Sequence, residues 1–388
     1  MRIAQVAPLY ESVPPQAYGG TERVVSYLSE ELVRRGHEVT LFASGDSRTE
    51  AELVACCARS LRLDSGCRDQ LAYHLVMLEQ VCRRASEFDI IHFHVDYLHF
   101  PVSVRQKYAH LTTLHGRLDF PEVEMVHRHY PSIPLVSISN DQRKPLPRAN
   151  WQGTVYHGLP LDMYSFREHP EEYLLFLGRV SREKRVDRAI DIATRAGLKL
   201  KIAAKVDKAD QEYFDNEIKP LLDNPLIEFI GEVGGKDKQD LMARALAFLF
   251  PIDWPEPFGL VMIESLACGT PVIAWPNGSV PEIMEDGVTG FIVTSIEEAV
   301  QAVRKVSGVS RAGCRKAFEQ RFSAGRMAED YLRIYNRVAC TGGKQGSGFG
   351  AYGDGEAVRS MRPGDLPGAS KKAWSHPWRD RLPLAGSP

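Results

Sequence analysis

The sequence of 388 residues contains no apolar run approaching the roughly 20 residues that a helix needs to cross a bilayer. Its seven cysteines, scattered from Cys56 to Cys340, form neither a C-x-x-C pair nor an even framework for disulfides. The 48 basic and 50 acidic side chains nearly cancel, so no whole-chain field draws the protein to nucleic acid or membrane. The first residues show no signal-peptide core. We therefore expect a cytoplasmic protein and exclude a small disulfide-rich secreted fold.

The composition provides enough apolar material for more than one core. Hydrophobic residues make up 44% of the chain and charged residues 25%, which is typical of globular proteins. At roughly 150 residues per domain, the length predicts two domains and an appendage.

Residues 340–388 differ from the rest of the chain. They hold 10 glycines, 5 prolines and 5 serines in 49 positions. Such a segment buries too little apolar surface to offset its ordering entropy, so we expect a disordered tail. The alternative is that Trp374 and Trp378 dock on another surface.

The chain before this tail alternates strand and helix patterns. Residues 3–9 and 39–43 are predicted strands around an amphipathic helix at 21–35, which is a β-α-β unit and predicts a parallel sheet. Further strand candidates in this half lie at residues 90–94, 111–114, 136–139 and 154–156. A second series begins at residue 173, with strands predicted at residues 173–177, 200–204, 227–230, 247–251, 272–274 and 290–293. Helices are predicted between them at residues 187–195, 236–245 and 260–267.

These two series predict an α/β protein with two Rossmann-like, doubly wound domains that face each other across a cleft. We place the first domain at residues 1–165 and the second at 166–322, with a linker near 160–170. The helix predicted at 323–339 carries an apolar stripe that packs either on its own domain or back on the first. In open α/β sheets the ligand lies beyond the carboxyl ends of the strands, so the cleft is the expected site.

Two segments at predicted strand ends could bind an anion. Gly19 and Gly20 precede the first helix, where backbone N–H groups and the helix dipole favour a phosphate. Arg179 and Lys184 follow the strand at 173–177 and would place two cations at its carboxyl end. The alternatives are a plain turn at the glycines and a solvated basic turn at the cations.

Two glutamates, Glu256 and Glu264, bracket the start of the helix predicted at 260–267. Paired carboxylates serve as the acid and nucleophile of a glycosidase, and a carboxylate also accepts hydrogen bonds from the diol of a ribose or hexose. Glu264 stands among apolar residues, so its carboxylate needs a partner.

Histidines provide a further candidate. His115 follows the strand at 111–114, and Gly116 after it gives room for close approach of a sugar hydroxyl or a developing charge. The alternative is a structural histidine. His92, His94 and Asp96 alternate on one strand face, as zinc ligands do, but no further ligand stands near with suitable spacing, so we predict no metal.

Together these segments resemble the retaining glycosyltransferases of the family 4 group, which have the GT-B fold and include glycogen-synthase-like, group 1 transferases. The resemblance covers about residues 1–338. The segment 254–274, WPEPFGLVMIESLACGTPVIA, matches the family signature and is highly specific, and the match continues through residues 277–283 and 286–290. Residues 178–184 match the pyrophosphate-binding turn of the family, and Gly19-Gly20 matches its glycine loop.

The resemblance implies a role for each matching residue. Arg179 and Lys184 would neutralise the diphosphate of a nucleotide-sugar donor, and Gly19-Gly20 would touch its phosphates. Glu264 would hold the ribose hydroxyls, and His115 would lie near the reacting end of the sugar. Glu256 and the backbone N–H groups of two residues would hold the donor sugar; these two residues are Phe258 and Gly259.

The implied reaction is transfer of a hexose from a UDP- or GDP-sugar to a hydroxyl acceptor with retention, by front-face attack and without metal or other cofactor. The acceptor would be a carbohydrate, a lipid-linked molecule or a small molecule bound by the first domain, and no nucleic acid takes part. Acceptor specificity is expected in residues 97–107 and 117–134. There His127, Arg128 and His129 form a solvated loop, which we favour, a polar wall for the acceptor, or a patch that meets anionic lipid at the inner face of the membrane.

The sequence departs from the family pattern at three places. Arg185 replaces a usual glycine, His157-Gly158 stands where Asn-Gly is common, and Asn277-Gly278-Ser279 replaces a usual glycine pair. They affect the expected donor and acceptor details. The alternative functions are a glycosidase, a sugar-nucleotide epimerase of the same fold, and a non-catalytic binding protein on this fold.

Overall fold

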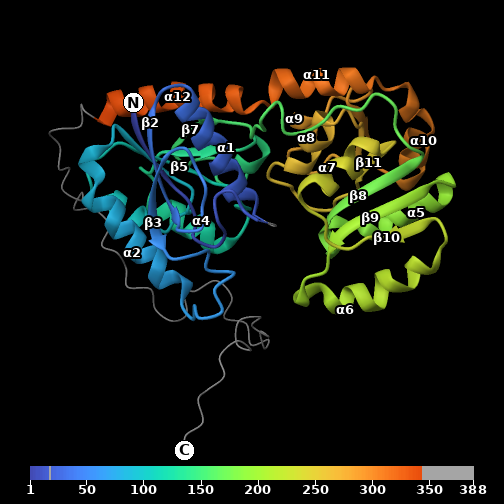
Figure 1. Ribbon diagram of the computed structural model, residues 1–388, viewed down its shortest axis with the longest axis horizontal. Helices are drawn as coiled ribbons and strands as arrows, with labels where there is room; N and C mark the ends of the chain where they lie inside the picture. Colours follow the sequence, from blue (N-terminus) through green and yellow to red (C-terminus); the bar gives the residue numbers. More distant parts are fainter. Residues whose placement is uncertain (17–18, 343–388) are drawn as a thin grey trace, which may run out of the picture. The chain divides into compact units, whose positions relative to one another are not determined.

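A computed structural model of the chain describes residues 1–16 and 19–342, which form two parallel β-sheets flanked by helices (Figure 1). The tail predicted at 340–388 lies outside the described residues from 343 onward, and so do Trp374 and Trp378. Its first three residues instead continue the last helix, which ends at Gly342. No helix within 1–16 and 19–342 is long and apolar enough to cross a membrane.

The first sheet has seven parallel strands in the order β3-β2-β1-β4-β5-β6-β7. The strands are β1 (Arg2–Val6), β2 (Glu38–Ser44), β3 (Glu52–Cys57), β4 (Ile90–Phe93), β5 (His110–Thr113), β6 (Leu135–Ser137) and β7 (Trp151–Thr154). Because β1 lies between β2 and β4, the direction of winding reverses at β1. This reversal opens a crevice beyond the carboxyl ends of β1 and β4.

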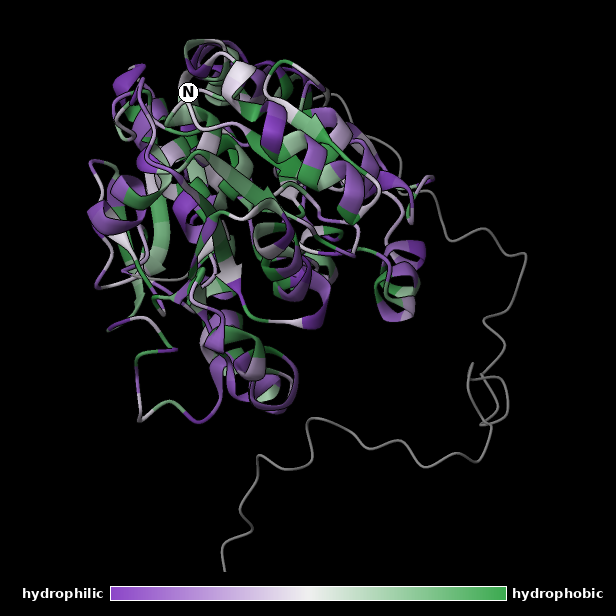
Figure 2. Cartoon of the chain, turned by 90° about the vertical axis from the view of Figure 1, so that its right-hand side faces the viewer, coloured by the Kyte–Doolittle hydropathy of each residue, from purple (hydrophilic) through white to green (hydrophobic). Residues whose placement is uncertain are grey.

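The second sheet has six parallel strands in the order β10-β9-β8-β11-β12-β13. The strands are β8 (Tyr173–Arg179), β9 (Lys199–Lys205), β10 (Ile227–Phe229), β11 (Ala247–Phe250), β12 (Val272–Ala274) and β13 (Gly290–Ile292). Here the winding reverses at β8, between β9 and β11. Figure 2 shows hydrophobic colours concentrated on strands and hydrophilic colours on the outward faces of helices, as expected for parallel sheets covered on both faces.

Helices connect and cover the strands. They are α1 (Gly20–Arg34), α2 (Gln70–Arg83), α3 (Phe100–Ser103), α4 (Pro121–His129), α5 (Val186–Ala196), α6 (Gln211–Tyr213), α7 (Gly235–Arg244), α8 (Leu260–Ala267), α9 (Val280–Ile283), α10 (Ile296–Lys305), α11 (Arg311–Arg321) and α12 (Ala324–Gly342). Local sequence explains several of their ends: Gly197 adopts the left-handed conformation after α5, and the Ser295 side chain caps α10 by accepting from the Glu298 N–H.

The edges of the first sheet differ from the sequence prediction. β3 was not predicted, because Glu52–Cys57 is only half buried and lacks clean alternation. The last strand was predicted at 154–156, but β7 is Trp151–Thr154, where Trp151 pairs with Leu135 and Gly153 pairs with Val136. Pairing with a neighbour sets the register of an edge strand, and single-sequence periodicity does not contain that information.

The last helix, α12, packs on the first sheet. Its apolar stripe is buried against α1, β4 and β5 (Figure 1). The stripe consists of Met327, Tyr331, Ile334, Tyr335 and Val338. Sequence alone left open which domain receives this stripe, and the structure assigns it to the sheet formed by the first 154 residues.

The interpretation of residues 117–134 as a solvated loop was wrong about the secondary structure and about His127, whereas Arg128 and His129 are exposed as expected. The segment contains the helix α4, and His127 on it is buried against Phe100, with 5.4 Å between ring centroids. Burial lowers the pKa of His127 to about 4, so this imidazole is neutral at pH 7. Of the predicted basic cluster, Arg128 and His129 are exposed.

Candidate functional site

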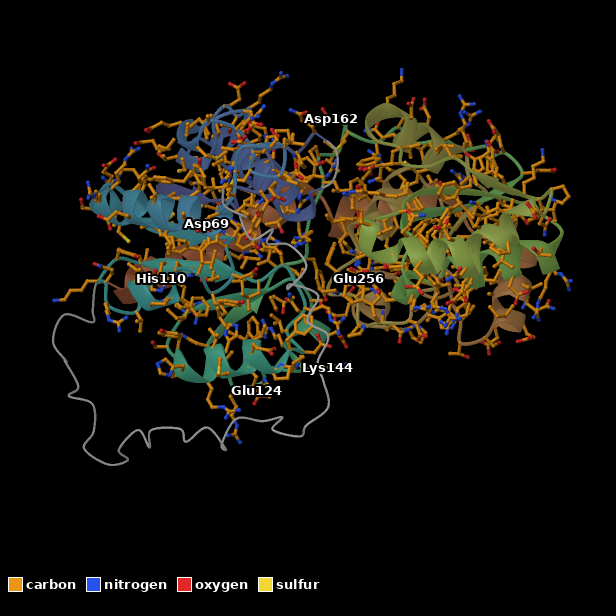
Figure 3. The ribbon with its side chains drawn as sticks, turned by 90° about the horizontal axis from the view of Figure 1, so that it is seen from below. Asp69, His110, Glu124, Lys144, Asp162 and Glu256 are labelled. Carbon is orange, nitrogen blue, oxygen red and sulfur yellow. The ribbon has the colours of Figure 1, made fainter. Side chains whose placement is uncertain are left out.

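A cavity of about 520 Å³ opens at the carboxyl ends of β1, β4 and β5 and is closed on its other side by the segment that precedes α8. The residues predicted from sequence that line it are Gly19, Gly20, His115, Glu256, Phe258 and Gly259. Figure 3 labels Glu256, which lies on the side of the second sheet that faces this cavity. Residues from both sheets therefore meet around one space.

The N-terminus of α1 forms one wall of the cavity. Gly19 and Gly20 begin the helix, and Thr21 and Glu22 on its first turn also line the space. The partial positive charge of a helix N-terminus favours an anion at this position. The predicted glycine loop thus lies where a phosphate could approach backbone N–H groups.

Lys184 joins the cavity indirectly, through Glu256. The ammonium group of Lys184 donates a hydrogen bond to the Glu256 carboxylate, and it lies 4.6 Å from the ring centroid of Trp254. The side chains of Lys184 and Glu256 are 20% and 12% exposed, so both charges are largely removed from water. A cation and a carboxylate held together at a cavity wall can bind a phosphate and a sugar hydroxyl side by side.

Arg179, at the end of β8, does not line the cavity. Its guanidinium donates to Glu183 over 2.8 Å and lies 3.7 Å from Asp207 and 3.9 Å from Asp210. This acidic environment holds the side chain on the surface of the second sheet. Arg179 therefore pairs with carboxylates of the second sheet, whereas Lys184 pairs with the cavity-lining Glu256; the resemblance implies that both touch one diphosphate.

Glu264 lies on α8, buried behind the cavity wall rather than on it. Its carboxylate accepts a hydrogen bond from Tyr164 over 2.8 Å and pairs with the Lys238 ammonium over 2.6 Å. Burial alone would raise the pKa of Glu264, but Lys238, with Arg23 nearby, holds it below its ordinary value. The buried Glu264 carboxylate was expected to need a partner, and Lys238 and Tyr164 provide it.

This placement argues against the glycosidase interpretation. A glycosidase needs two carboxyl groups that flank the scissile bond in one open site. Glu256 lines the cavity, whereas Glu264 is enclosed and ion-paired. The two glutamates do not form an acid and nucleophile pair.

His115 lies at the end of β5 and contacts other imidazoles. Its Nε2 lies 2.9 Å from Nδ1 of His94, and its ring stacks on His157 with 5.3 Å between centroids. Burial lowers the pKa of His115 to about 3, so the ring is neutral at pH 7. A neutral imidazole at a cavity wall can exchange hydrogen bonds with a sugar hydroxyl.

The metal interpretation of His92, His94 and Asp96 finds no geometric support. Both ring nitrogens of His92 and of His94 are hydrogen-bonded to protein side chains. Across the part of the chain that the structure describes, no group of three His, Cys, Asp or Glu side chains is arranged to hold a metal ion.

Sequence reasoning missed several residues on the side of the cavity that segments of the first sheet form. Tyr10, Glu22 and Arg62 line the cavity together with Tyr97, which was expected. Burial raises the pKa of Glu22 to about 7. Tyr10 and Glu22 follow β1, so the strand-end rule could have found them; Arg62 follows β3, a strand that the sequence did not predict.

The turn after β12 supports the segment that carries Glu256. Gly278 has a φ of +62°, and a Cβ there would lie 2.3 Å from the backbone oxygen of Glu256. The hydroxyl of Ser279 donates to the Phe258 carbonyl over 2.8 Å, and the Asn277 amide donates to Ile252. The departure at 277–279 therefore keeps the glycine that the close approach requires.

Arg185 preserves the turn that a glycine would make. It adopts the left-handed conformation, with φ 54° and ψ 51°, and its guanidinium pairs with Asp187 over 2.7 Å and Asp253 over 3.0 Å. The added cation is thus neutralised by carboxylates and does not line the cavity.

Replacing Arg185 with glycine should therefore change little. The loss of two partly exposed ion pairs, each worth up to about 1 kcal/mol, opposes the relief of about 1 kcal/mol of backbone strain. We expect a free energy of unfolding within about 1 kcal/mol of the original protein, measured by urea denaturation. Turnover should be unchanged, and a tenfold loss would instead show that Arg185 contributes charge to substrate binding.

Two facing parallel α/β sheets with a ligand-sized cavity at their strand ends define the GT-B class of fold, and solved structures agree. The glycosyltransferase AviGT4, involved in avilamycin A biosynthesis, is 25% identical with a TM-score of 0.68, over 88% of this chain and 98% of that one. Alr3699/HepE of Anabaena, solved in complex with UDP and glucose, is 19% identical with a TM-score of 0.65, over 87% and 100%.

The family models define the chain more closely. Residues 18–175 match the model of Glycosyltransferase Family 4, and residues 165–311 match that of Glycosyl transferases group 1. A relative, the uncharacterized glycosyltransferase MJ1607 of Methanocaldococcus jannaschii, is 25% identical over 339 residues, which cover 76% of this chain and 85% of that protein. The chain is a glycosyltransferase of the group 1 and family 4 type. The resemblance read from residues 254–290 is thereby confirmed.

Proposed function

We propose that the protein transfers a hexose from a nucleoside diphosphate sugar, UDP- or GDP-linked, to a hydroxyl acceptor with retention and without a metal ion. The observation that carries this proposal is the Lys184–Glu256 pair at a cavity lined by a helix N-terminus and a neutral histidine. The complex of HepE with UDP and glucose supports a nucleotide-sugar donor.

The groups around the cavity suit the two ends of such a donor. Lys184 stabilises the diphosphate, together with the N-terminus of α1. Glu256 accepts hydrogen bonds from sugar hydroxyls, and the backbone N–H groups of Phe258 and Gly259 donate to the sugar. Gly259 has a φ of +77°, and a Cβ there would lie 2.7 Å from Met262 Cε, so this backbone needs glycine.

To act on the donor, Arg179 must exchange its partner and Glu264 must gain one. Arg179 reaches the diphosphate by leaving Glu183, and the phosphate then replaces the carboxylate as its acceptor. Glu264 keeps free acceptor capacity beside Tyr164 and Lys238, because an ionised carboxylate has about four lone-pair positions. Because Glu264 lies behind the cavity wall, accepting from ribose hydroxyls also requires this wall to open toward it.

The proposed reaction develops negative charge on the leaving phosphate, next to the groups that line this part of the site. The bond from the anomeric carbon to the phosphate oxygen breaks while the acceptor oxygen bonds to the same face of that carbon. The acceptor proton passes to the departing phosphate, so no enzyme nucleophile is needed. Negative charge builds on the phosphate beside Lys184, and preorganised donors of this kind contribute about 2.7–4 kcal/mol each.

The acceptor is proposed to be a carbohydrate, a lipid-linked molecule or a small molecule bound against the wall formed by Tyr10, Glu22 and Tyr97. Contact with the inner face of a membrane is part of the proposal only for a lipid-linked acceptor. Co-sedimentation with anionic liposomes at low salt tests it, and a protein that stays in the supernatant removes the lipid-linked case.

A thermal shift panel tests the donor. UDP, GDP, ADP, dTDP and NAD are added with and without EDTA; a ligand at about 100 times its dissociation constant adds about 2.7 kcal/mol of stability. We expect one nucleoside diphosphate to stabilise the protein equally in both conditions. Loss of the shift in EDTA would contradict metal independence, and no shift with any nucleotide would contradict the donor assignment.

Product analysis then separates transfer from epimerisation. A transferase releases free nucleoside diphosphate only in step with acceptor glycosylation, and the product keeps the anomeric configuration of the donor. Conversion of the donor into an isomeric nucleotide sugar would instead indicate the epimerase, and binding without either product would indicate a non-catalytic protein.

A further inference from the structure

Gln5 is a buried polar residue in the middle of β1, where its neighbours Ala4 and Val6 are apolar and fully buried. Its side chain is fully buried too, so both ends of the amide need hydrogen-bond partners. Gln5 Oε1 lies 2.8 Å from His94 Nε2, and Gln5 Nε2 donates to the Tyr335 hydroxyl over 3.1 Å. Both ends are therefore satisfied.

On one side of Gln5 the hydrogen bonds lead to the cavity. His94 uses its second nitrogen, Nδ1, to contact His115 Nε2 over 2.9 Å. His94 and His115 both line the cavity. His115 Nδ1 is buried and has no hydrogen-bond partner within the residues that the structure describes, so it is the unpaired end of this chain of side chains.

On the other side the hydrogen bonds lead to α12. The Tyr335 hydroxyl lies 2.7 Å from His92 Nδ1, and His92 Nε2 lies 2.8 Å from the hydroxyl of Thr113. Thr113 in turn contacts the Tyr331 hydroxyl over 2.9 Å. The C-terminal helix is thereby connected to the cavity from Tyr335 through Gln5 and His94 to His115.

The direction of the Gln5 amide fixes the position of each proton toward the cavity. An amide oxygen only accepts, so His94 Nε2 carries a proton and donates to it. Neutral His94 then has an unprotonated Nδ1, which accepts from His115 Nε2–H. Neutral His115 in turn has an unprotonated Nδ1. If the amide were reversed, every proton would move to the other nitrogen, and His115 Nδ1 would be a donor.

The other end accommodates this direction of the amide. The Tyr335 hydroxyl can accept from the Gln5 NH₂ group while donating its own proton to His92 Nδ1. A hydrogen-bonded chain of this kind is polarised along its length, since each group must accept on one side and donate on the other.

We propose that Gln5 is a positioning residue that, anchored by Tyr335, holds His115 in its Nε2–H tautomer, so that the free nitrogen of this cavity-lining ring accepts a hydrogen bond from a hydroxyl group. The hydroxyl belongs to the donor sugar, and that identity rests on the proposed function. The tautomer itself does not depend on which reaction the protein catalyses.

The test measures the tautomer directly in the ligand-free protein. Histidine labelled with ¹⁵N reports which ring nitrogen carries the proton, and His115→Asn assigns the signal. At pH 7 we expect a single Nε2–H form for His115 in the original protein. Gln5→Met removes the acceptor for His94 at similar volume and should give a mixture of both tautomers. An unchanged His115 signal in folded Gln5→Met would overturn the proposal.

Two further variants control for a general effect on the fold. Tyr335→Phe keeps Gln5 in contact with His94 but removes its anchor, so it should also give a mixture; a single Nε2–H form would show that Tyr335 does not set the direction. This variant stands in if Gln5→Met does not fold. Tyr173→Phe removes a hydroxyl on β8 that donates to the Leu241 carbonyl on α7, and it should leave His115 unchanged.

Kinetics supply the functional readout. Gln5→Met should lower kcat about 10- to 100-fold, which is the typical loss when the residue that orients a metal-binding histidine is removed. It should leave the thermal shift by the nucleoside diphosphate unchanged. Loss of that shift would indicate structural damage rather than mispositioning and would count against the proposal. If neither the original protein nor any variant transfers sugar, the proposed function fails. The tautomer proposal is then still decided by the ¹⁵N measurement in the ligand-free protein.

Discussion

Replacing Lys184 with alanine is expected to lower turnover about 10²–10³-fold without unfolding the protein. Lys184 is paired with the cavity-lining Glu256, and its side chain is 20% exposed, a place where charge interactions are stronger than in water. Negative charge develops on the leaving phosphate only as the reaction proceeds, so the loss should fall mainly on kcat. Steady-state kinetics with the nucleotide sugar chosen by the thermal shift panel measure it.

A matched lysine shows whether this effect is local. Lys219 lies on the surface, 68% exposed and 4.0 Å from Asp215, and Lys219→Ala should leave kcat and KM unchanged. Thermal melts of both variants establish that they are folded. Turnover equal to that of the original protein in a folded Lys184→Ala would refute the role given to this residue.

Replacing Glu264 with leucine should lower the free energy of unfolding by about 3–5 kcal/mol, because it leaves the Lys238 charge without its partner in a largely buried place. The Glu264 side chain is 3% exposed, and Tyr164 also loses its hydrogen-bond acceptor. The same change should abolish the thermal shift by the nucleoside diphosphate if Glu264 holds the ribose. Urea denaturation followed by tryptophan fluorescence measures the first effect.

An exposed ion pair provides the control. Glu171 and Arg244 are both about half exposed, so Glu171→Leu should cost less than about 1 kcal/mol. A Glu264→Leu protein within about 1 kcal/mol of the original would contradict the argument from burial.

The pH dependence of stability follows from the same ion pair. The pKa of Glu264 in the folded protein lies below its ordinary value of 4.5, so the unfolded chain binds this proton first as the pH falls. The stability from Glu264 is therefore fully present above about pH 4.5 and is lost as the pH falls through the folded pKa. Glu264→Leu should show a shallower loss of stability over that acid range.

Local patterns predicted the elements nearest the site well. The helix at 260–267 was predicted with the bounds of α8, and the strand at 272–274 with those of β12. Such segments are short, apolar and bounded by glycine or proline, so their limits are set by neighbouring residues. The edge strands β3 and β7 were missed or shifted because their position depends on a partner strand.

The sequence predicted which residues belong to the candidate site but not which of them pair with one another. Sequence motifs located Lys184, Glu256 and Glu264, yet nothing local indicates that Glu256 pairs with Lys184, 72 positions away, or that Glu264 pairs with Lys238. Arg179 shows the reverse case: its motif is present, but nearby carboxylates hold its side chain away from the cavity.

The sequence by itself determined the two α/β series, the turns that need glycine and the reaction class, because hydrophobic period, backbone freedom and motif spacing are properties of neighbouring residues. Only the tertiary structure decided that α12 returns to the first sheet, that His127 is buried, and that Gln5 connects Tyr335 to His115. Gln5 and Tyr335 are 330 positions apart, and only the packing of α12 on the first sheet brings them within hydrogen-bond distance.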